Sequence, residues 1–542
     1  MATDARQQHS FADPSPALNM INRVNVGDVI TRATDQFPDR EAVIGPDGTA
    51  ITYRELEANI NRLGHALLGL GLKRGDVVGV LARNCTEILL IYFACARAGL
   101  IFAPMNLGLK GEDIAYCLAD AGAQVLVAES EFQDMVRSFP RDLVARQRVF
   151  WIGEVPGVPV KGSAGTLSEL VTEGSAEPLE VFVDDRDGVQ LLYTSGTTSN
   201  PKGVVTGHLA VIMSGLSGAL AHGMSAGGAT TVLVSLPLFH CAMLNGNVMP
   251  AFMVGGKAVL QRGFAPDIIP DLIEKHRIHH LTLLPVMYAT LLQQSNVQGR
   301  DFTSVVRAGY AMAPMPEERL KAIHALFPNA DVVLGAGQTE FTPAACRQRA
   351  EHQWSKAASW GTATAMTRIG IMDEEGNLLP RGEIGEVVYR GPQVMNGYLK
   401  LPEQTAESFR HGWFHSGDMA WMDEDGAVWF TDRKKDVIKT GGENVASIEV
   451  ERCLLAHPAV ADVAVVGLYH PRWGEAITAV VIPQSGAEIE AEELAGHCRS
   501  RLAGFKVPKS ILIEQELPRT GTGKIQKHVI RASLKDFYLL KG

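Results

Sequence analysis

Short apolar runs alternate with longer amphipathic segments through most of the chain. The stretch 52–72, TYRELEANINRLGHALLGLGL, carries leucine or isoleucine at every third or fourth position. This spacing predicts an amphipathic helix. Thr52 and Glu55 stand three residues apart at its start, as in a capping box. The segment therefore predicts a helix that begins just after Thr52.

Runs of β-branched and apolar residues predict buried strands between such helices. They lie at 76–82, 124–129, 231–240, 280–285 and 331–337. Strands that alternate with helices indicate layered α/β structure with mostly parallel sheets.

Three other segments depart from this alternation. The Gly-, Pro-, Ser- and Glu-rich segment 153–180 is expected to be a surface excursion. From Gly382 onward the pattern changes to short strands with tight turns. The last hundred residues predict a compact unit with helices near 447–457 and 491–502 and strands at 460–468 and 477–483.

Composition narrows the functional classes. The 542 residues carry a net charge of −10, which argues against broad nucleic-acid binding. Seven scattered cysteines without a Cys-x-x-Cys pair favour reduced thiols and a cytoplasmic location. No apolar signal-peptide region opens the chain. The longest apolar run, 88–105, is interrupted by Arg97 and predicts a buried core element rather than a transmembrane segment.

The segment 193–203, YTSGTTSNPKG, follows a predicted strand and is rich in hydroxyls and glycine. Exposed backbone N–H groups and hydroxyls can form a nest for phosphate oxygens, and Lys202 adds a positive charge. An ordinary surface turn has a similar composition. The Walker pattern is absent.

This loop resembles the phosphate loop of the adenylate-forming superfamily, which contains acyl-CoA synthetases, luciferases and adenylation domains. Ser199 stands where the family has glycine. Further family segments follow in order at 311–316, 334–340, 412–436, 438–451 and 518–531, so that the resemblance covers roughly 26–530. Its closest likeness is to fatty-acid or aryl-acid CoA ligases.

The resemblance implies a nucleotide site that holds Mg·ATP. Thr339 would touch the α-phosphate, Glu340 would hold Mg²⁺, and Lys524 would be the catalytic lysine. Ala336 replaces the family's adenine-stacking tyrosine. The full set of expected ATP-binding residues is Thr194, Ser195, Gly196, Thr197, Thr198, Lys202, Ala313, Gly335, Ala336, Gly337, Gln338, Asp418 and Arg433.

The resemblance also implies sites for CoA and for the acid. Gly441 and Gly442 would border the pantetheine tunnel, although a plain hairpin turn fits their spacing equally well. Trp473 would contact CoA, and a half-buried core tryptophan is a comparable reading. His240 would line or gate the acid pocket, as a catalytic-site residue. The expected acid-pocket residues are His240, Ala242, Met243, Leu244, Gly309, Tyr310 and Gly335.

By the same resemblance, a tail at 1–25 precedes a large N-terminal domain at 26–433. That domain would combine layered α/β sheets with a small β-barrel-like subdomain. A hinge at 434–435, centred on Lys435, would lead to a small mobile α+β domain at 436–542. Rotation about the hinge would exchange Lys524 for the glycine turn between two half-reactions.

The implied enzyme is an AMP-forming acyl-CoA synthetase with ATP, Mg²⁺ and CoA as co-substrates or cofactor. Its acid could be fatty, aryl or cyclic. A stand-alone enzyme that loads a carrier protein is the alternative, although Phe239-His240 replaces the Phe-Asp pair of amino-acid-activating members. A luciferase-type oxygenase is a distant third. The sequence leaves the oligomeric state open, a homodimer included.

Overall fold

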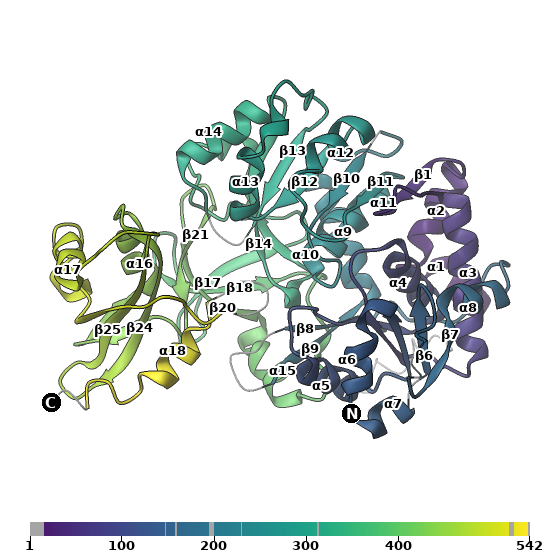
Figure 1. Cartoon of the computed structure of the whole chain (residues 1–542), viewed down its shortest axis with the longest axis horizontal. Helices are drawn as coiled ribbons and strands as arrows, with labels where there is room; N and C mark the ends of the chain where they lie inside the picture. Colours follow the sequence, from purple (N-terminus) through teal and green to yellow (C-terminus); the bar gives the residue numbers. More distant parts are fainter. Residues whose placement is uncertain are drawn as a thin grey trace, which may run out of the picture. The chain divides into compact units, whose positions relative to one another are not determined.

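The computed structural model describes residues 16–146, 148–157, 160–194, 200–228, 230–311, 314–519 and 525–539 (Figure 1). The chain divides into two compact units. The first comprises Met1–Arg368 and Arg390–Glu407, and the second comprises Ile369–Tyr389 and Ser408–Gly542. Each is described below by itself.

An eight-stranded, mostly parallel sheet forms one layer of the first unit. Its strands, in spatial order, are β19 (Gly397–Tyr398), β9 (Lys202–Gly207), β8 (Gly188–Thr194), β4 (Ile101–Pro104), β3 (Val77–Leu81), β5 (Val125–Glu129), β6 (Arg148–Ile152) and β7 (Ser163–Thr166). Every residue of β3 and β5 is buried, as their uninterrupted apolar runs predict. Strands β8 and β9 form an antiparallel hairpin, and β19 pairs antiparallel with β9 at the edge.

A nine-stranded sheet forms the other layer. Its order is β16 (Thr362–Ala363), β15 (Ala344–Arg347), β14 (Asp331–Gly337), β13 (Arg307–Tyr310), β12 (His280–Leu283), β10 (Thr231–Val234), β11 (Lys257–Leu260), β1 (Glu41–Ile44) and β2 (Ala50–Thr52). Strands β10 to β14 run parallel. The chain then turns back, and β15 pairs antiparallel with β14.

The two faces of this sheet have different partners. Leu281, Tyr310 and Leu334 lie in a hydrophobic core with helices α12 (Ile269–His276), α13 (Pro285–Leu292) and α14 (Glu317–Leu326), which surround β12 and β13 in Figure 1. Neighbouring strand residues point to the opposite face. There the His280 ring meets the ring of His222, the last residue of helix α9 (His208–His222), edge-on at 5.7 Å.

The second unit contains two sheets and a small set of helices. The first sheet has the order β17 (Arg368–Met372), β18 (Gly385–Arg390), β20 (Phe414–Met422) and β21 (Val428–Arg433), and the last three strands pair antiparallel. The second sheet contains β23 (Glu443–Val445), β22 (Ile438–Thr440), β25 (Gly474–Pro483), β24 (Val460–His470) and β26 (Ser510–Ile513). Helices α16 (Ser447–Leu455), α17 (Ala491–Arg499) and α18 (Lys527–Ser533) accompany it. The α/β class with a small C-terminal domain is confirmed.

Local patterns account for many of these elements. Helix α3 (Tyr53–Gly69) begins after Thr52, whose hydroxyl accepts a hydrogen bond from the Glu55 backbone N–H, while the Glu55 carboxylate accepts one from the Thr52 N–H. The predicted capping box is therefore confirmed. The expected surface excursion at 153–180 is wrong in part. It contains β7 and helix α8 (Leu167–Glu173), whose Leu167 and Leu170 are buried in the core.

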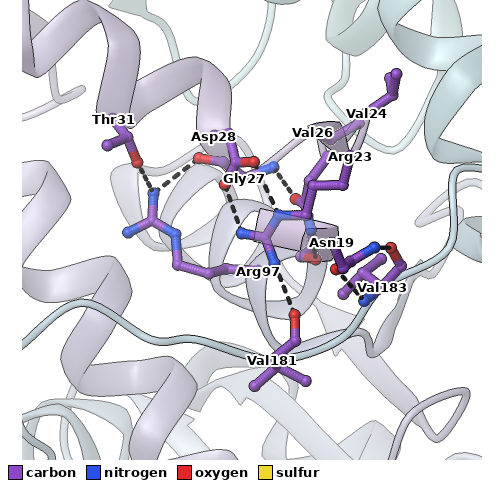
Figure 2. Close-up of polar contacts among 12 residues, drawn as sticks. Asn19, Arg23, Val24, Val26, Gly27, Asp28, Thr31, Arg97, Val181 and Val183 are labelled. Atoms are coloured by element: carbon purple, nitrogen blue, oxygen red, sulfur yellow. Dashed lines mark hydrogen bonds and ion pairs between the residues drawn. The ribbon is translucent and has the colours of Figure 1, made fainter. Parts of the chain in front are cut away.

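Helix α4 (Thr86–Ala98) carries the apolar run that Arg97 interrupts, and it is a core helix as predicted. Arg97 is 3% exposed and donates to both carboxylate oxygens of Glu57 at 2.7 and 2.9 Å. It also donates to the Gly27 carbonyl and the Thr31 hydroxyl, both at 2.8 Å (Figure 2). None of the helices in the described part of the chain is long and apolar enough to cross a membrane.

Nearby, Arg23 binds both Asp28 oxygens at 2.8 and 3.0 Å and the Val181 carbonyl at 2.7 Å (Figure 2). The two arginines thus join helices α1 (Pro16–Asn22), α2 (Asp28–Gln36), α3 and α4 to the segment that leads into β8. Arg23 Nε and the terminal nitrogens of both guanidinium groups donate to acceptors, so the ion pairs can offset their desolvation.

Glu57→Ala is expected to destabilise the first unit by about 3 kcal/mol, because it leaves the buried Arg97 without its carboxylate. The midpoint of urea unfolding measures this loss. Asp39→Ala is the matched control, since the Asp39–Arg54 pair is 82% and 63% exposed and should leave the free energy of unfolding nearly unchanged. Equal losses in both variants would contradict this account of Arg97.

Candidate active site

The predicted phosphate loop connects the β8–β9 hairpin. Ser195, Gly196, Thr197 and Thr198 lie outside the described residues. The two ends of the loop are described: Thr194 pairs with Lys202 in the antiparallel register. The hairpin thus holds the ends of the loop together and fixes where Lys202 emerges.

Three side chains gather beside this hairpin. The Tyr398 hydroxyl donates to the Glu340 carboxylate at 3.0 Å, and the Lys202 ammonium lies 5.2 Å from the centre of the Tyr398 ring. The Glu340 backbone carbonyl accepts from the Met395 N–H at 2.8 Å. The structure therefore brings Lys202 and Glu340, both expected at the site, to the two sides of one tyrosine.

Glu340 offers a hard oxygen ligand next to a phosphate-binding loop. Within the described ranges, no group of three or more His, Cys, Asp or Glu side chains is placed to hold a metal ion. Mg²⁺ characteristically binds through one or two carboxylates and completes its shell with phosphate oxygens and water. The single carboxylate therefore fits an ion that arrives with a nucleotide.

Thr339 and Glu340 belong to a single 3₁₀ turn, Thr339–Phe341, that follows β14. The end of β14 needs a residue without a side chain: a Cβ on Gly337 would lie 1.9 Å from the Pro343 carbonyl oxygen. Ala336 and Gln338 flank this glycine, and Ala336 pairs with Cys346 on β15. The expected nucleotide residue Ala313 lies outside the described residues.

His240 precedes the short helix α10 (Cys241–Met243). The Cys241 thiol lies 3.6 Å from the Thr339 hydroxyl, which brings the His240 segment next to the turn Thr339–Phe341. The His240 ring packs on Phe239 with ring centres 4.7 Å apart.

The other expected acid-pocket residues form two groups. Asn247 donates to the Ala242 carbonyl at 2.8 Å and accepts from the Thr282 hydroxyl at 2.7 Å. A Cβ on Gly309 would lie 2.8 Å from that hydroxyl, so that Ala242 and Gly309 flank one polar patch. Tyr310 points to the opposite face of the sheet, into the core with α13. Met243 and Leu244 are fully buried in the core of the first unit.

In the second unit, Asp418 and Arg433 face each other across strands β20 and β21. The Arg433 guanidinium lies 2.8 Å from the Asp418 carboxylate, and their side chains are 48% and 8% exposed. Lys435 follows two residues later in a turn in which the Asp436 N–H donates to the Arg433 carbonyl at 2.8 Å. Lys524 lies outside the described residues.

The expected CoA residues come together. Gly441 and Gly442 have φ of +61° and +90°, values that favour glycine. The Gly441 N–H donates to the Trp473 carbonyl at 2.8 Å, and a Cβ on Gly441 would lie 3.1 Å from the Trp473 ring. Arg472 and Lys509 place cations 4.6 and 5.3 Å from that ring. A planar, cation-flanked surface of this kind suits an anionic aromatic ligand.

Tyr398 is the contact that sequence reasoning missed. It lies in the segment NGYLK, on a two-residue strand that pairs with β9. So short a strand has no periodicity to detect. The only available signal was a lone tyrosine beside turn residues.

Comparisons with known proteins identify the family of the chain. The AMP-binding enzyme family matches residues 30–399, and the AMP-binding enzyme C-terminal domain matches residues 449–524. A feruloyl-CoA synthase from Amycolatopsis is 36% identical over 502 residues, covering 91% of this chain and 98% of that protein. An indoleacetate–CoA ligase from Aromatoleum aromaticum is 33% identical, covering 92% and 97%.

Solved structures agree. ATP-bound MatB from Rhodopseudomonas palustris aligns with a TM-score of 0.84 and 28% identity over 95% of this chain and 100% of that one. The o-succinylbenzoate CoA synthetase MenE from Bacillus subtilis, in complex with its acyl-adenylate, aligns with a TM-score of 0.81 and 27% identity over 94% and 98%. The resemblance noted in the sequence is confirmed, and the chain belongs to the AMP-binding enzyme family as an AMP-forming acyl-CoA synthetase.

Proposed function

We propose that this enzyme joins a fatty, aryl or cyclic carboxylic acid to CoA through an acyl-adenylate, with Mg·ATP as the energy source. The observation that carries the proposal is the grouping of Glu340, Tyr398 and Lys202 beside the phosphate-loop hairpin. A single held carboxylate and a nearby ammonium suit a metal-bound triphosphate. The CoA-ligase relatives and the ATP-bound structural neighbour support the same reaction.

In the first half-reaction, the acid carboxylate attacks the α-phosphorus of ATP and pyrophosphate leaves. Lys202 and the loop hydroxyls would bind the departing pyrophosphate, and Thr339 would donate to the α-phosphate. Mg²⁺ held by Glu340 would supply Lewis-acid neutralisation of phosphate charge. Lys524 would offset charge as the mixed anhydride forms. Asp418 would accept from the ribose hydroxyls, with Arg433 beside it.

In the second half-reaction, the CoA thiolate attacks the acyl carbon and AMP leaves. Gly441 and Gly442 would let the pantetheine arm pass close to the backbone, because they carry no side chain. Trp473 would pack against CoA. Lys435, in the turn after β21, would be the hinge between the two half-reactions.

We propose a cytoplasmic location because the cysteines carry no disulfide bonds. None of the seven forms a disulfide and all are buried, and the sulfur atoms of Cys453 and Cys498 lie 4.0 Å apart rather than bonded. Free thiols are typical of a reducing compartment.

The general test is a panel of carboxylic acids incubated with ATP, Mg²⁺ and CoA. Formation of AMP, pyrophosphate and an acyl-CoA with at least one acid supports the proposal. No CoA-dependent thioester with any acid would refute it. Transfer to a free phosphopantetheinylated carrier protein, but not to CoA, would favour the carrier-loading alternative.

Tyr398→Phe is expected to lower kcat/KM for Mg·ATP in pyrophosphate release about 10-fold, because Glu340 loses the hydroxyl that orients it. The Mg²⁺ concentration needed for half-maximal rate should rise with it. Glu340→Gln should cost about 100-fold or more. Tyr469→Phe, at a tyrosine that is 60% exposed, is the control and should behave as wild type. A Tyr398→Phe enzyme with unchanged Mg²⁺ dependence would refute the role of this contact.

Lys524→Ala should slow adenylate formation about 100-fold or more. It should spare the reaction of CoA with a supplied acyl-adenylate. Lys535→Ala removes an exposed lysine near the same end of the chain and serves as control. Equal loss of both half-reactions in Lys524→Ala would show that the lysine does not act in the first step alone.

Gly441→Val should affect the other half-reaction from Lys524→Ala. It should slow thioester formation from a supplied acyl-adenylate at least about 10-fold and spare pyrophosphate release. A valine there meets the Trp473 ring and a left-handed backbone. Gly504→Val is the matched control, because Gly504 has no heavy atom within 4 Å of its Cβ position and no positive φ. Loss of the first half-reaction in Gly441→Val would contradict the assignment.

A further inference from the structure

Four basic side chains gather on the α9 face of the nine-stranded sheet. Strand register pairs His280 of β12 with Arg307 of β13, and it pairs Gly335 of β14 with Arg347 of β15. Residues in register on neighbouring strands share a face. His222, at the end of α9, lies over this face against His280. The basic cluster is defined here as His222, His280, Arg307 and Arg347.

Two contacts of His222 Nε2 in the basic cluster cannot both be hydrogen bonds at the same time. The Arg347 guanidinium donates to His222 Nε2 at 2.7 Å, so that nitrogen must carry a lone pair. The same Nε2 lies 3.1 Å from the Gly246 carbonyl oxygen, where only an N–H would bond. A ring nitrogen can carry either a proton or a lone pair, and one of the two contacts is therefore unsatisfied.

Other polar atoms of the cluster also lack partners. Within the part of the chain that the structure describes, Arg347 Nε, Arg307 Nε, His222 Nδ1 and His280 Nδ1 are buried without a hydrogen-bond acceptor or donor. Arg307 has one carboxylate, Asp331, at 3.1 Å, and that side chain is 44% exposed. Arg347 has no ion pair with any described carboxylate. Both arginines are only partly exposed, and guanidinium groups largely removed from water are ordinarily paired.

The charge of the cluster comes from its arginines. Burial lowers the pKa of His280 to about 3 and that of His222 well below its ordinary value, so both rings are neutral near pH 7. Burial and the neighbouring Arg307 lower the pKa of Arg347 to about 10, which still leaves the guanidinium protonated. Arg307 pairs with one exposed carboxylate, Asp331, and Arg347 forms no ion pair within the described residues, so the four-residue cluster has an excess positive charge.

The basic cluster adjoins the residues expected to bind the acid. A Cβ on Gly335 would lie 3.9 Å from Arg347 Nε, so this glycine leaves the guanidinium uncovered. Gly309, two residues after Arg307 on the same face, packs closely against Thr282, whose hydroxyl would lie 2.8 Å from a Cβ there. Arg307 and Arg347 also line a cavity of about 350 Å³ together with Ser217 of α9. That volume is in the range of small-molecule sites.

We infer that the acid substrate carries a second carboxylate at its far end, and that Arg347, assisted by Arg307, binds this group. The inference rests on the proposed function and specifies its substrate class. With the anion bound, the Arg347 fork gains the acceptors that it lacks. His222 Nε2 is then released to donate to the Gly246 carbonyl. Gly335 and Thr339 are four residues apart, at most about 14 Å along a strand, which suits a medium-chain or single-ring dicarboxylic acid.

The test compares acids of matched size that differ only at the far end. Suberic acid is paired with octanoic acid, and terephthalic acid with p-toluic acid, in the pyrophosphate-release assay. Wild type should prefer the dicarboxylic member of at least one pair. R347M should lower kcat/KM for that acid about 100-fold and change the monoacid less than about 3-fold. The kcat/KM of R347K for the dicarboxylic acid should lie between those of wild type and R347M, because an ammonium keeps the positive charge but lacks the two-pronged guanidinium geometry.

R54M is the matched control, since Arg54 is 63% exposed, pairs with Asp39 at 3.0 Å, and does not line the cavity. It should keep the wild-type preference. Without ATP, the preferred dicarboxylate should raise the Tm of wild type and R54M but not of R347M. This binding measurement shows whether R347M is folded and does not depend on turnover.

The outcomes separate the inference from the proposed function. Wild type that converts monoacids to CoA thioesters, shows no preference for dicarboxylates and is unaffected by R347M would overturn the inference alone. Stimulation of octanoic acid turnover by added acetate or phosphate, lost in R347M, would also overturn it, because a separate anion would then fill the cluster. No thioester with any acid would overturn the proposed function and the inference with it.

Discussion

The chain reversal after β14 is the constraint on which the first unit depends. Gly337 lies so close to the Pro343 carbonyl that any side chain would collide with it, and Thr342 takes a left-handed φ of +52° before β15 begins. The Thr342 carbonyl is buried against α9 and accepts a hydrogen bond from the Ser214 hydroxyl. This tight reversal fixes Thr339 and Glu340 at the strand end. It also sets the register that places Arg347 beside Gly335.

The held carboxylate is the second feature that the reversal makes possible. Glu340 accepts a hydrogen bond from a neutral hydroxyl, that of Tyr398, while the Lys202 ammonium lies over the tyrosine ring. A direct ion pair with lysine would have neutralised the carboxylate and competed with a metal. A hydroxyl orients a carboxylate without cancelling its charge. The site is thus arranged for a cation that comes and goes with the nucleotide.

Much of the architecture follows from local patterns, and the failures have identifiable causes. The α3 capping box and the buried β3 and β5 depend on neighbouring residues, so the sequence alone predicts them. Segment 153–180 was misjudged because its turn residues mask β7 and α8, which are held by tertiary packing of Leu167 and Leu170. For the site, motif residues such as Glu340 and Asp418 are visible in the sequence. Tyr398 and Arg347 are not, since strand pairing across long stretches of chain brings them into place.

The position of Arg347 on β15 has an evolutionary consequence. The turn Thr339–Phe341 lies within the chain reversal, and Arg347 lies on the strand that follows it, where backbone pairing places it beside Gly335. A mutation at 347 would alter which acids are accepted and leave the groups that handle phosphate in place. Enzymes that share this fold could in this way come to accept different acids while they keep the same reaction with ATP.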